Sequence, residues 1–428
     1  MKFTKLFALL LLAALAFGAV AVMAQDEAPT GELEIFSWWT GGGEAAGLDA
    51  LIAQFSEMYP DVTVVNAAVA GGSGVNARAV LQTRMLGGDP PDTFQVHAGQ
   101  ELNAVWVAEG KMQALNDLYE ANGWMDQYPQ GLLDLISDAE GNIYSVPVNI
   151  HRSNVMWYVP ANLEAWGVTV PATWDEFIST TCPALQAADV TPLTVGENWT
   201  QAHLWESVAL GELGVDGYNG LWNGATAWDS DEVVAVFEKF GQILDCTNAD
   251  RNGLSWQDAS QRVAEGAAAF NIMGDWAAGY FLVDLALEPG TGFAWAASPG
   301  TDGTFIMLSD TFGLPVGAPN PGAVNAWLSF LGSAEGQDIF NPLKGSLPAN
   351  TTADIGNSEL YNAYFQDAYE DWTTNAIVGS QAHGAVAPPN FSNGFSTVIA
   401  SFESDRDAAT AAASSAELAA ENGMMGDM

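Results

Sequence analysis

Basic residues are scarce in this chain. Its 428 residues include 11 Lys and Arg against 52 Asp and Glu, which gives a formal net charge of −41 at pH 7. Nucleic acids and anionic membrane surfaces are bound through clustered basic side chains, so this balance argues against both kinds of partner. Such acidity is typical of a solubility adaptation, for example to a salty habitat. Calcium binding is the alternative, although no D-x-[DN]-x-[DN]-G run supports it.

The sequence motifs of several enzyme classes are missing. The chain has no G-x-S-x-G, no H-E-x-x-H, no phosphate-binding loop and no G-x-G-x-x-G after a strand. Its four histidines are dispersed, and no pair has the spacing of metal ligands, so neither a metal nor another cofactor is expected. His203 falls in an apparent helix and is expected to be structural. A secreted glycosidase stays open as an alternative, because it needs only two suitably spaced carboxylates.

Long apolar runs are limited to the N-terminus. Lys2 and Lys5 precede an apolar stretch in which Val22 and Ala24 suit the −3 and −1 positions of a cleavage site. Residues 1–24 are therefore predicted to be a signal peptide, and an uncleaved membrane anchor is the alternative. No second apolar run of about 18 residues follows. The mature protein is expected in the periplasm or at the outer face of the cell membrane.

Cysteine is also scarce, with only Cys182 and Cys246 in the chain. In an oxidising compartment the two are candidates for a single disulfide, and two separate buried thiols are the alternative. Their spacing matches no metal site.

Strand-like and helical patterns alternate regularly in the first quarter of the chain. The patterns predict strands at 33–37, 62–69 and 93–98 and helices at 47–59 and 75–88. The order β–α–β–α–β is typical of a parallel, doubly wound α/β unit, in which ligands bind beyond the carboxyl ends of the strands. Four residues fall at or near such ends: Trp38, Trp39, Gln95 and His97.

The remainder of the chain mixes strand-like and helical segments. Strand-like stretches cover 142–160, 292–300 and 305–315, and helical patterns cover 173–188, 231–244, 260–273, 321–340 and the C-terminal part. The length is about twice that of one domain. No Ser/Gly-rich linker is present, so two lobes joined by several crossings of the chain are expected.

Tryptophan is abundant, with 16 in the chain, and several lie in turn-like stretches beside polar residues. These stretches are "SWWTGG", "GENWTQ", "GLSWQD" and "MGDWAAG". A flat aromatic ring suits the apolar face of a pyranose, and polar side chains suit its rim of hydroxyls. A place in the core explains any single Trp better, but the set as a whole favours sugar recognition.

Longer stretches resemble the bacterial extracellular solute-binding proteins of sugar ABC transporters, family 1, and especially their glucose/mannose-binding members. The most specific are "VNARAVLQTRMLGGDPPDTFQVHAG" and "IHRSNVMWY", accompanied by "EIFSWWTGG", "VGENWTQAHLWESVAL", "AFNIMGDWAAGY", "LSDTFGLP", "EGQDIFNPLKGS" and "VGSQAHGAVAP". The similarity runs from about residue 32 to residue 405.

The resemblance implies an α/β, two-lobed periplasmic-binding-protein fold of type II, with a ligand cleft between lobes joined by a multi-segment hinge. One lobe would hold 31–142 and 293–345, and the other 146–290 and 348–415. It also implies a protein that is not an enzyme. Such a protein, a monomer, would capture a glucose- or mannose-like hexose and deliver it to the permease transmembrane subunits of an ABC importer. A carbohydrate-binding surface protein is a further alternative.

The resemblance also implies which residues contact the sugar. They are Trp38, Trp39, Glu44, Gln95, His97, His151, Trp256, Trp276, Asp310, Lys344 and His383. Trp39 would face the sugar, whereas Trp38 would pack toward the lobe or line the edge of the cleft. A buried charge beside a neutral sugar is costly when unpaired, so Lys344 is expected next to a carboxylate.

Overall fold

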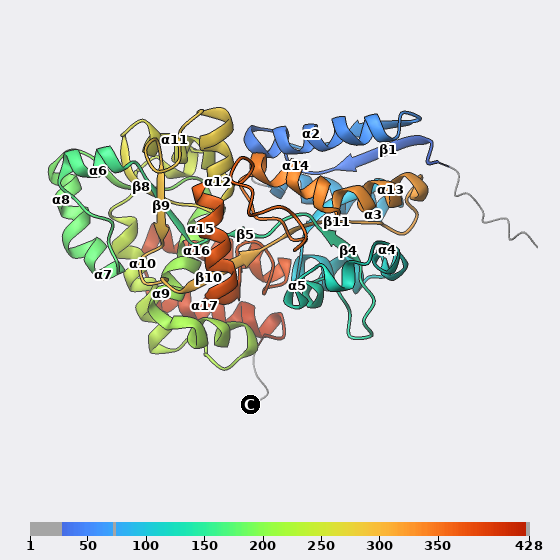
Figure 1. Ribbon diagram of the computed structural model, residues 1–428. Helices are drawn as coiled ribbons and strands as arrows, with labels where there is room; N and C mark the ends of the chain where they lie inside the picture. Colours follow the sequence, from blue (N-terminus) through green and yellow to red (C-terminus); the bar gives the residue numbers. More distant parts are fainter. Residues whose placement is uncertain (1–27, 72–73, 425–428) are drawn as a thin grey trace, which may run out of the picture.

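The computed structural model describes residues 28–71 and 74–424, and the predicted signal peptide lies outside them. Figure 1 shows two lobes side by side, each with helices around a sheet. One contains the blue N-terminal elements and the orange helices α13 and α14, and the other contains the green, yellow and red elements. The two-lobed α/β fold expected from the sequence is therefore present.

The first lobe is built on a five-stranded sheet of order β2-β1-β3-β11-β4. Its strands are β1 Gly31–Phe36, β2 Val62–Asn66, β3 Thr93–His97, β4 Ser145–Pro147 and β11 Asp310–Gly313. Strand β1 is parallel to β2 and β3, whereas β11 runs antiparallel to β3 and β4. Its helical segments are α2 Gly42–Met58, α3 Val75–Gly87, η2 Leu102–Val107, α4 Asn116–Asn122, η3 Trp124–Asp126, α5 Gln130–Leu135, α13 Pro321–Leu331 and α14 Ala334–Lys344.

The second lobe has two smaller sheets, of order β7-β8-β6-β9 and β12-β10-β5. Their strands are β5 His151–Arg152, β6 Val155–Tyr158, β7 Thr191–Thr194, β8 Ala268–Ile272, β9 Ala294–Ala297, β10 Thr304–Leu308 and β12 Ala376–Gly379. The helical segments are α6 Pro160–Trp166, α7 Trp174–Glu176, η4 Phe177–Thr181, α8 Cys182–Ala187, α9 Asn198–Asn223, α10 Asp231–Leu244, η5 Arg251–Gly253, α11 Trp256–Ala264, α12 Trp276–Gly279, η6 Tyr280–Asp284, α15 Ala363–Thr374, α16 Pro389–Asp405 and α17 Ala408–Glu421.

Local sequence explains where several of these helices begin. Ser230 precedes α10, and its side chain accepts a hydrogen bond from the backbone N–H of Val233. Ser255 and Asp258 form a reciprocal capping box at the start of α11. Each cap satisfies N–H groups that have no partner within the helix. These caps fix the start of α11 at Trp256, the first of the two tryptophans expected from the second lobe.

Two expectations about elements are wrong. The pattern over 260–273 predicted one helix, but α11 ends at Ala264 and residues 268–272 form strand β8. Gly266 lies between them with φ +74°, a backbone conformation that turns the chain and favours glycine. Residues 293–308 were expected in the first lobe, but β9 pairs with β6 and β10 pairs with β5, both in the second lobe.

Three crossings of the chain join the lobes. The first links β4 to β5, the second links β10 to β11 through Ser309, and the third follows α14. Ile150 and Leu347 form an antiparallel bridge between the first and third crossings. Ser309 Oγ donates to the carbonyl of Asn149 at 2.7 Å, which ties the second crossing to the first. The three crossings are therefore joined to one another.

The apolar core has two parts, and one of them spans the junction of the lobes. The second lobe has its own cluster around Trp205, Trp228 and Phe237. The other cluster contains the core of the first lobe together with Trp276 and Phe281 of the second. Segments α12 and η6 therefore pack against α2 and α14 across the junction. Of the helices in the described part of the chain, none is long and apolar enough to cross a membrane.

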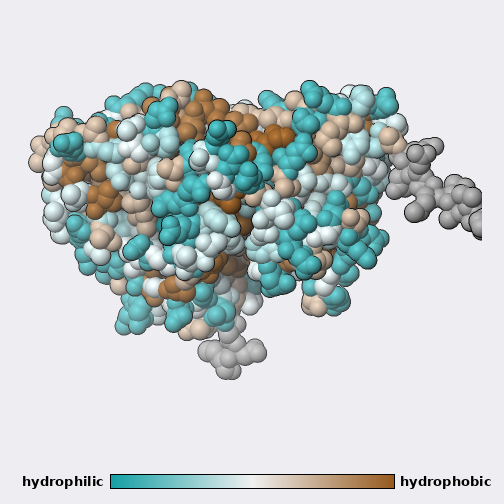
Figure 2. Space-filling view, in the orientation of Figure 1, coloured by the Kyte–Doolittle hydropathy of each residue, from teal (hydrophilic) through white to brown (hydrophobic). Residues whose placement is uncertain are grey.

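On the face drawn in Figure 2, hydrophilic residues are spread over both lobes and apolar residues gather along the upper edge.

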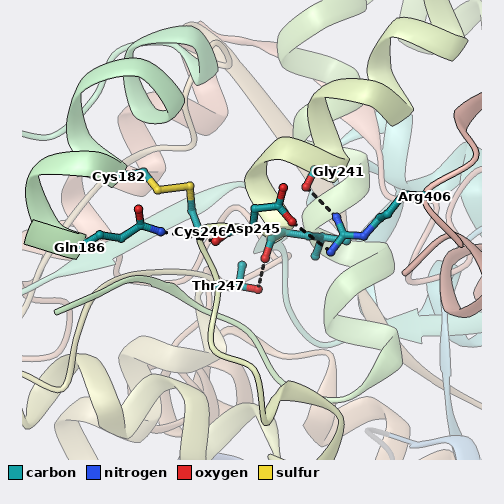
Figure 3. The surroundings of a disulfide bond; sticks show 8 residues. Cys182, Gln186, Gly241, Asp245, Cys246, Thr247 and Arg406 are labelled. Carbon is teal, nitrogen blue, oxygen red and sulfur yellow. Dashed lines mark hydrogen bonds and ion pairs between the residues drawn. A yellow bond between two sulfur atoms is a disulfide. The ribbon is translucent and has the colours of Figure 1, made fainter. Parts of the chain in front are cut away.

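Cys182 and Cys246 form a disulfide that joins the start of α8 to the segment after α10. In Figure 3, Asp245 beside this bond faces Arg406, which donates to the carbonyl of Gly241. The bond lies within the second lobe, so it stabilises that lobe and leaves the hinge free.

Candidate functional site

Asp310 lies at the centre of the junction, as the first residue of β11 after the second crossing. Its Oδ1 accepts a hydrogen bond from Gln95 at 2.7 Å, and its Oδ2 accepts one from Asn149 at 2.8 Å. The Nε2 atoms of His97 and His151 lie 3.6 and 3.4 Å from these oxygens. Burial raises the pKa of the Asp310 carboxyl, but His151, Lys344 and His97 outweigh it and hold that pKa well below its usual range.

His97 links Asp310 to the edge of the first lobe. It pairs in register with Asp310 across β3 and β11, and its Nδ1 lies 2.7 Å from Glu101 Oε2. Burial raises the pKa of Glu101, but the neighbouring His97 and Arg78 lower it below its usual value. The ring of Trp38 packs on the ring of His97 at a centroid distance of 5.1 Å. The guanidinium carbon of Arg78 lies 5.5 Å from the centre of the Trp38 ring.

Lys344 forms the expected ion pair. Its Nζ lies 2.8 Å from Glu44 Oε1, so the last residue of α14 is joined to the first turn of α2. The ammonium also lies 5.8 Å from the ring centres of Trp39 and Trp276, one from each lobe. This distance allows a cation–π attraction to both rings. Lys344 is thus the positive charge around which the two lobes meet.

The two adjacent tryptophans make different contacts. The ring of Trp39 packs against Phe312 and Phe340 of the first-lobe core, with Lys344 beside it. Trp38 instead contacts His97, next to the central carboxylate. Trp38 thus lies beside a polar group of the first lobe, whereas Trp39, which was expected to face the sugar, packs mainly on aromatic rings of the first-lobe core.

His151 joins the centre to the second lobe. Its Nδ1 hydrogen-bonds with the carboxylate of Asp275, which also accepts the backbone N–H of Arg152 at 3.0 Å. Burial lowers the pKa of His151, but the charge of Asp275 together with hydrogen bonds to Asp275 and Asp310 outweighs it, so the pKa is raised above its usual value. The next residue, Trp276, places its ring 5.4 Å from the His151 ring. Trp276 and Asp275 thus act from the N-terminal end of α12.

His383 stands on the loop after β12, with its ring 5.1 Å from Trp276 and 5.7 Å from His97. Two further rings of α9 complete this side. Trp199 lies 5.9 Å from His383, and His203 lies 5.3 Å from it. His203 also contacts Trp276 at 5.7 Å, so it belongs to the cluster and is not only a structural histidine of a helix. Burial lowers its pKa to about 4, so its ring is neutral at pH 7.

Trp256 lies apart from the other expected residues. It begins α11, and its ring packs against Tyr280 at 5.7 Å. The aromatic contacts of Trp276 go to His151, Trp199, His203 and His383 instead. Of the two tryptophans expected to stack on a ligand from the second lobe, only Trp276 is thus joined to the central cluster by the contacts of the described residues.

Several residues of the cluster were not singled out in the sequence, although each neighbours one that was. They are Glu101, Asn149 and Asp275, whereas Trp199 was noted only as part of "GENWTQ" and His203 was assigned to structure. Asp275 directly precedes Trp276, and Glu101 lies one helical turn after His97. Trp199 stood in the "GENWTQ" turn, whose sequence showed a tryptophan beside polar residues without showing which way it faces.

A cleft leads from the surface to this cluster. It has a volume of about 480 Å³ and lies between α3 and η2 of the first lobe and α9, α16 and the loop at 381–384 of the second. Glu101 and Trp199 line the cleft and also contact His97 and His383 of the central cluster. The central residues themselves are buried, because the lobes meet over them.

One group in this region has the composition of a metal site. Ligand atoms of His203, Glu206 and His383 lie within 4.8 Å of one another. The hydroxyl of Ser380, however, bonds both Glu206 oxygens and His383 Nδ1, each at 2.9 Å. Two of the three candidate ligands are thus already joined by a protein hydroxyl, and the group fits a hydrogen-bonded chain better than a metal ion.

Comparisons with known proteins match this architecture. A family profile described as "Bacterial extracellular solute-binding protein" covers residues 40–338. An uncharacterised ABC transporter extracellular-binding protein of Pyrococcus horikoshii is 32% identical over 422 residues, which are 95% of this chain and 94% of that protein. A probable sugar-binding periplasmic protein of Rhizobium meliloti is 31% identical over 392 residues, which are 90% of this chain and 92% of that protein.

A solved structure resembles the whole chain. The bacterial solute receptor AcbH, described as having an exclusive substrate preference for β-D-galactopyranose, superposes with a TM-score of 0.79. The alignment covers 92% of this chain and 99% of that one at 20% identity. At this identity the likeness concerns the fold.

Proposed function

The chain belongs to the bacterial extracellular solute-binding protein family, and from this premise we propose that it captures a monosaccharide, a glucose- or mannose-like hexose. Proteins of this family bind solutes and catalyse no reaction, so the protein is not an enzyme and the glycosidase alternative is wrong.

The observation that carries the proposal is the composition of the central cluster. Asp310 supplies carboxylate oxygens, Gln95 and Asn149 supply amides, and Lys344 supplies an ammonium. The rings of Trp38, Trp39, Trp199 and Trp276 surround these groups from both lobes. A hexose offers the complement, because it has hydroxyls around its rim and C–H groups on its faces. Ten of the eleven residues expected from the sequence, all but Trp256, are joined to this cluster by the contacts described above.

Capture and release require the lobes to move, because the cluster is buried. A sugar that contacts both lobes binds the closed arrangement more tightly than the open one and shifts the population toward it. The crossings at 147–151, 308–310 and 345–350 are the segments that would bend. His151 and Asp310 lie within or directly beside them, so ligand contacts and the hinge share residues.

The closed protein would then deliver its sugar to the transmembrane permease subunits of an ABC importer. The P. horikoshii relative is described as the extracellular binding protein of such a transporter, and the R. meliloti relative as periplasmic. We therefore place the mature chain outside the cytoplasm, in the periplasm or at the outer face of the membrane, and expect a monomer. Loss of sugar uptake after deletion of its gene, restored by the wild-type copy, tests this role.

Calorimetry tests the ligand. Purified mature protein, freed of bound sugar by unfolding and refolding, is titrated with glucose, mannose, galactose and maltose. We expect saturable heat with a hexose, and weaker binding of the same hexose by the Asp310→Asn variant. Absence of heat with all four sugars on folded, ligand-free protein would contradict the hexose assignment. Tighter binding of maltose than of any hexose would show that the ligand is a disaccharide and not a hexose.

A further inference from the structure

Glu206, in the third turn of α9, is fully buried and surrounded by hydrogen-bond donors. Its Oε2 accepts the backbone N–H groups of Gln381 at 2.9 Å and Ala382 at 3.1 Å. Its Oε1 accepts the hydroxyl of Ser153, at 2.9 Å, from the second lobe's β5–β6 connection. The carboxylate thus holds the loop that carries His383 against α9.

Ser380 connects this carboxylate to His383. Its Oγ lies 2.9 Å from both Glu206 oxygens and 2.9 Å from His383 Nδ1. A hydroxyl has one proton to donate. When that proton points to the carboxylate, the hydroxyl can only accept from His383, so the imidazole proton must lie on Nδ1. The other nitrogen, Nε2, then carries a lone pair.

Among the described residues, His383 Nε2 is one of several buried side-chain atoms without a hydrogen-bond partner, and the two ring nitrogens of the neighbouring His203 are others. The ring of His383 lies between Trp276 and Trp199, beside His97. Burial and the neighbouring histidines hold the pKa of His383 well below its usual value, so the ring is neutral. A neutral ring with a free, buried Nε2 is prepared for one hydrogen bond, and its tautomer decides the direction of that bond.

We propose that Glu206 is a positioning residue that, through Ser380, keeps the proton of His383 on Nδ1 and makes Nε2 an acceptor for a ligand hydroxyl. The acceptor role rests on the proposed sugar-binding function, whereas the position of the proton does not. By this arrangement a side chain that contacts no ligand selects sugars whose nearest hydroxyl can donate at this point.

The position of the proton can be measured without any ligand. Long-range ¹H–¹⁵N NMR of the histidine rings distinguishes protonated from unprotonated nitrogens, and His383→Gln identifies the His383 signals. The measurement is made at pH 8.5, above the value of about 7 to which burial raises the pKa of Glu206. We expect His383 to carry its proton on Nδ1. A proton on Nε2 in the wild-type protein would overturn the proposal.

Two variants test the hydrogen-bonded chain from Glu206 through Ser380 to His383. In Glu206→Gln the amide group can donate to Ser380 Oγ, whose own proton then turns to His383 Nδ1. In Ser380→Ala the partner of Nδ1 is removed. Both changes are expected to move the His383 proton to Nε2 and to weaken binding of the sugar found by calorimetry, by roughly ten- to hundred-fold. If both variants fold, keep the proton on Nδ1 and bind unchanged, the proposal is wrong.

Asp92→Asn is the matched control. Asp92 is also buried and accepts the backbone N–H groups of Glu34 and Asn320, but it lies at the opposite end of β3 from His97. This variant is expected to lose stability while keeping both the His383 tautomer and the affinity. If the wild type has its proton on Nδ1 but binds no sugar, the proposed function fails and the proton assignment stands.

Discussion

Asp310 is the residue at the centre of the cluster, where its carboxylate lies next to Gln95, Asn149, His97 and His151. Replacing it with Asn keeps the shape but removes the charge that faces His97, His151 and Lys344. A hydrogen bond to a charged group contributes about 1.5–3 kcal/mol, so Asp310→Asn is expected to raise the Kd roughly ten- to hundred-fold. Calorimetry measures the Kd, and circular dichroism checks the fold. An unchanged Kd in a folded variant would remove Asp310 from the ligand site.

Trp276 is the tryptophan that contacts the most histidine rings of the cluster, namely His151, His203 and His383. Removing it in Trp276→Ala takes away an apolar face that we assign to the sugar, at a cost of about 1.5–3 kcal/mol. The Kd should rise by roughly ten- to hundred-fold. Trp228→Ala is the control, because Trp228 is buried in the second-lobe core beside Trp205. It should lower the melting temperature and leave the Kd alone; equal losses of affinity in both variants would count against a ligand role for Trp276.

At the scale of single residues, the sequence predicted which residue types form the cluster better than it predicted which way their side chains face. Lys344 was expected beside a carboxylate because an unpaired buried charge is costly, and it pairs with Glu44. The roles of Trp38 and Trp39 could not be assigned in the same way. Which ring faces Phe340 and which faces His97 depends on how β11 and α14, more than 250 positions later in the chain, pack against this turn.

At the scale of elements, a glycine makes one of the close backbone contacts between the lobes. A Cβ added to Gly279, at the end of α12, would lie 2.4 Å from the carbonyl oxygen of Lys344 and 2.7 Å from that of Leu343. Helix α12 therefore packs on the end of α14 with backbone against backbone. Contacts this short cannot accommodate a methyl group unless the two segments separate.

Gly279→Ala is accordingly expected to hinder closure without unfolding either lobe. Alanine suits the helical backbone of residue 279, so the cost arises at the junction. We expect a Kd increase of at least ten-fold and a larger radius of gyration by small-angle X-ray scattering in the presence of sugar. Gly131→Ala, where the added atom would meet open space, is the control. Wild-type affinity and compactness in Gly279→Ala would refute this account of the junction.

The expectations about elements failed where local pattern and tertiary packing disagree. The stretch "AEGAAAFNIM" has strong helix formers, yet residues 268–272 form β8 because they pair with β6 and β7 on both sides. The strands 93–97 and 31–36 were predictable because alternation with long amphipathic helices marks them clearly. Strand β9 was placed in the wrong lobe because pairing partners are not visible in a segment's own sequence.

At the scale of the molecule, the few positive charges are unevenly used. Exposed pairs such as Arg262–Asp250 contribute little, since water and salt screen them. Arg152 and Lys344 are each only a few per cent exposed; Lys344 pairs with Glu44 at the junction of the lobes, and Arg152 pairs with Asp371 within the second lobe. In a chain with net charge −41, each of these two buried cations therefore offsets the charge of a carboxylate beside it.

The stability of the whole protein should depend on pH through Glu206. Burial raises the pKa of this carboxyl from 4.5 to about 7, so the folded protein binds this proton more tightly than the unfolded chain does. The resulting stabilisation is fully present below the unfolded pKa and is lost as pH rises through 7. His203 acts in the opposite direction, because burial lowers its pKa from 6.5 to about 4, and its contribution is lost as pH falls through that range.

Glu206→Gln isolates the first of these effects, since His203 is common to both proteins. The free energy of unfolding of the wild type, relative to the variant, is expected to fall by roughly 3 kcal/mol between about pH 5 and pH 8. Urea unfolding at several pH values measures it, provided that both proteins unfold in one transition or that the second lobe is followed separately. A difference that stays constant over this range would show that the Glu206 carboxylate is ionised throughout, with its hydrogen bonds to Ser153, Ser380 and the loop amides outweighing the cost of burial.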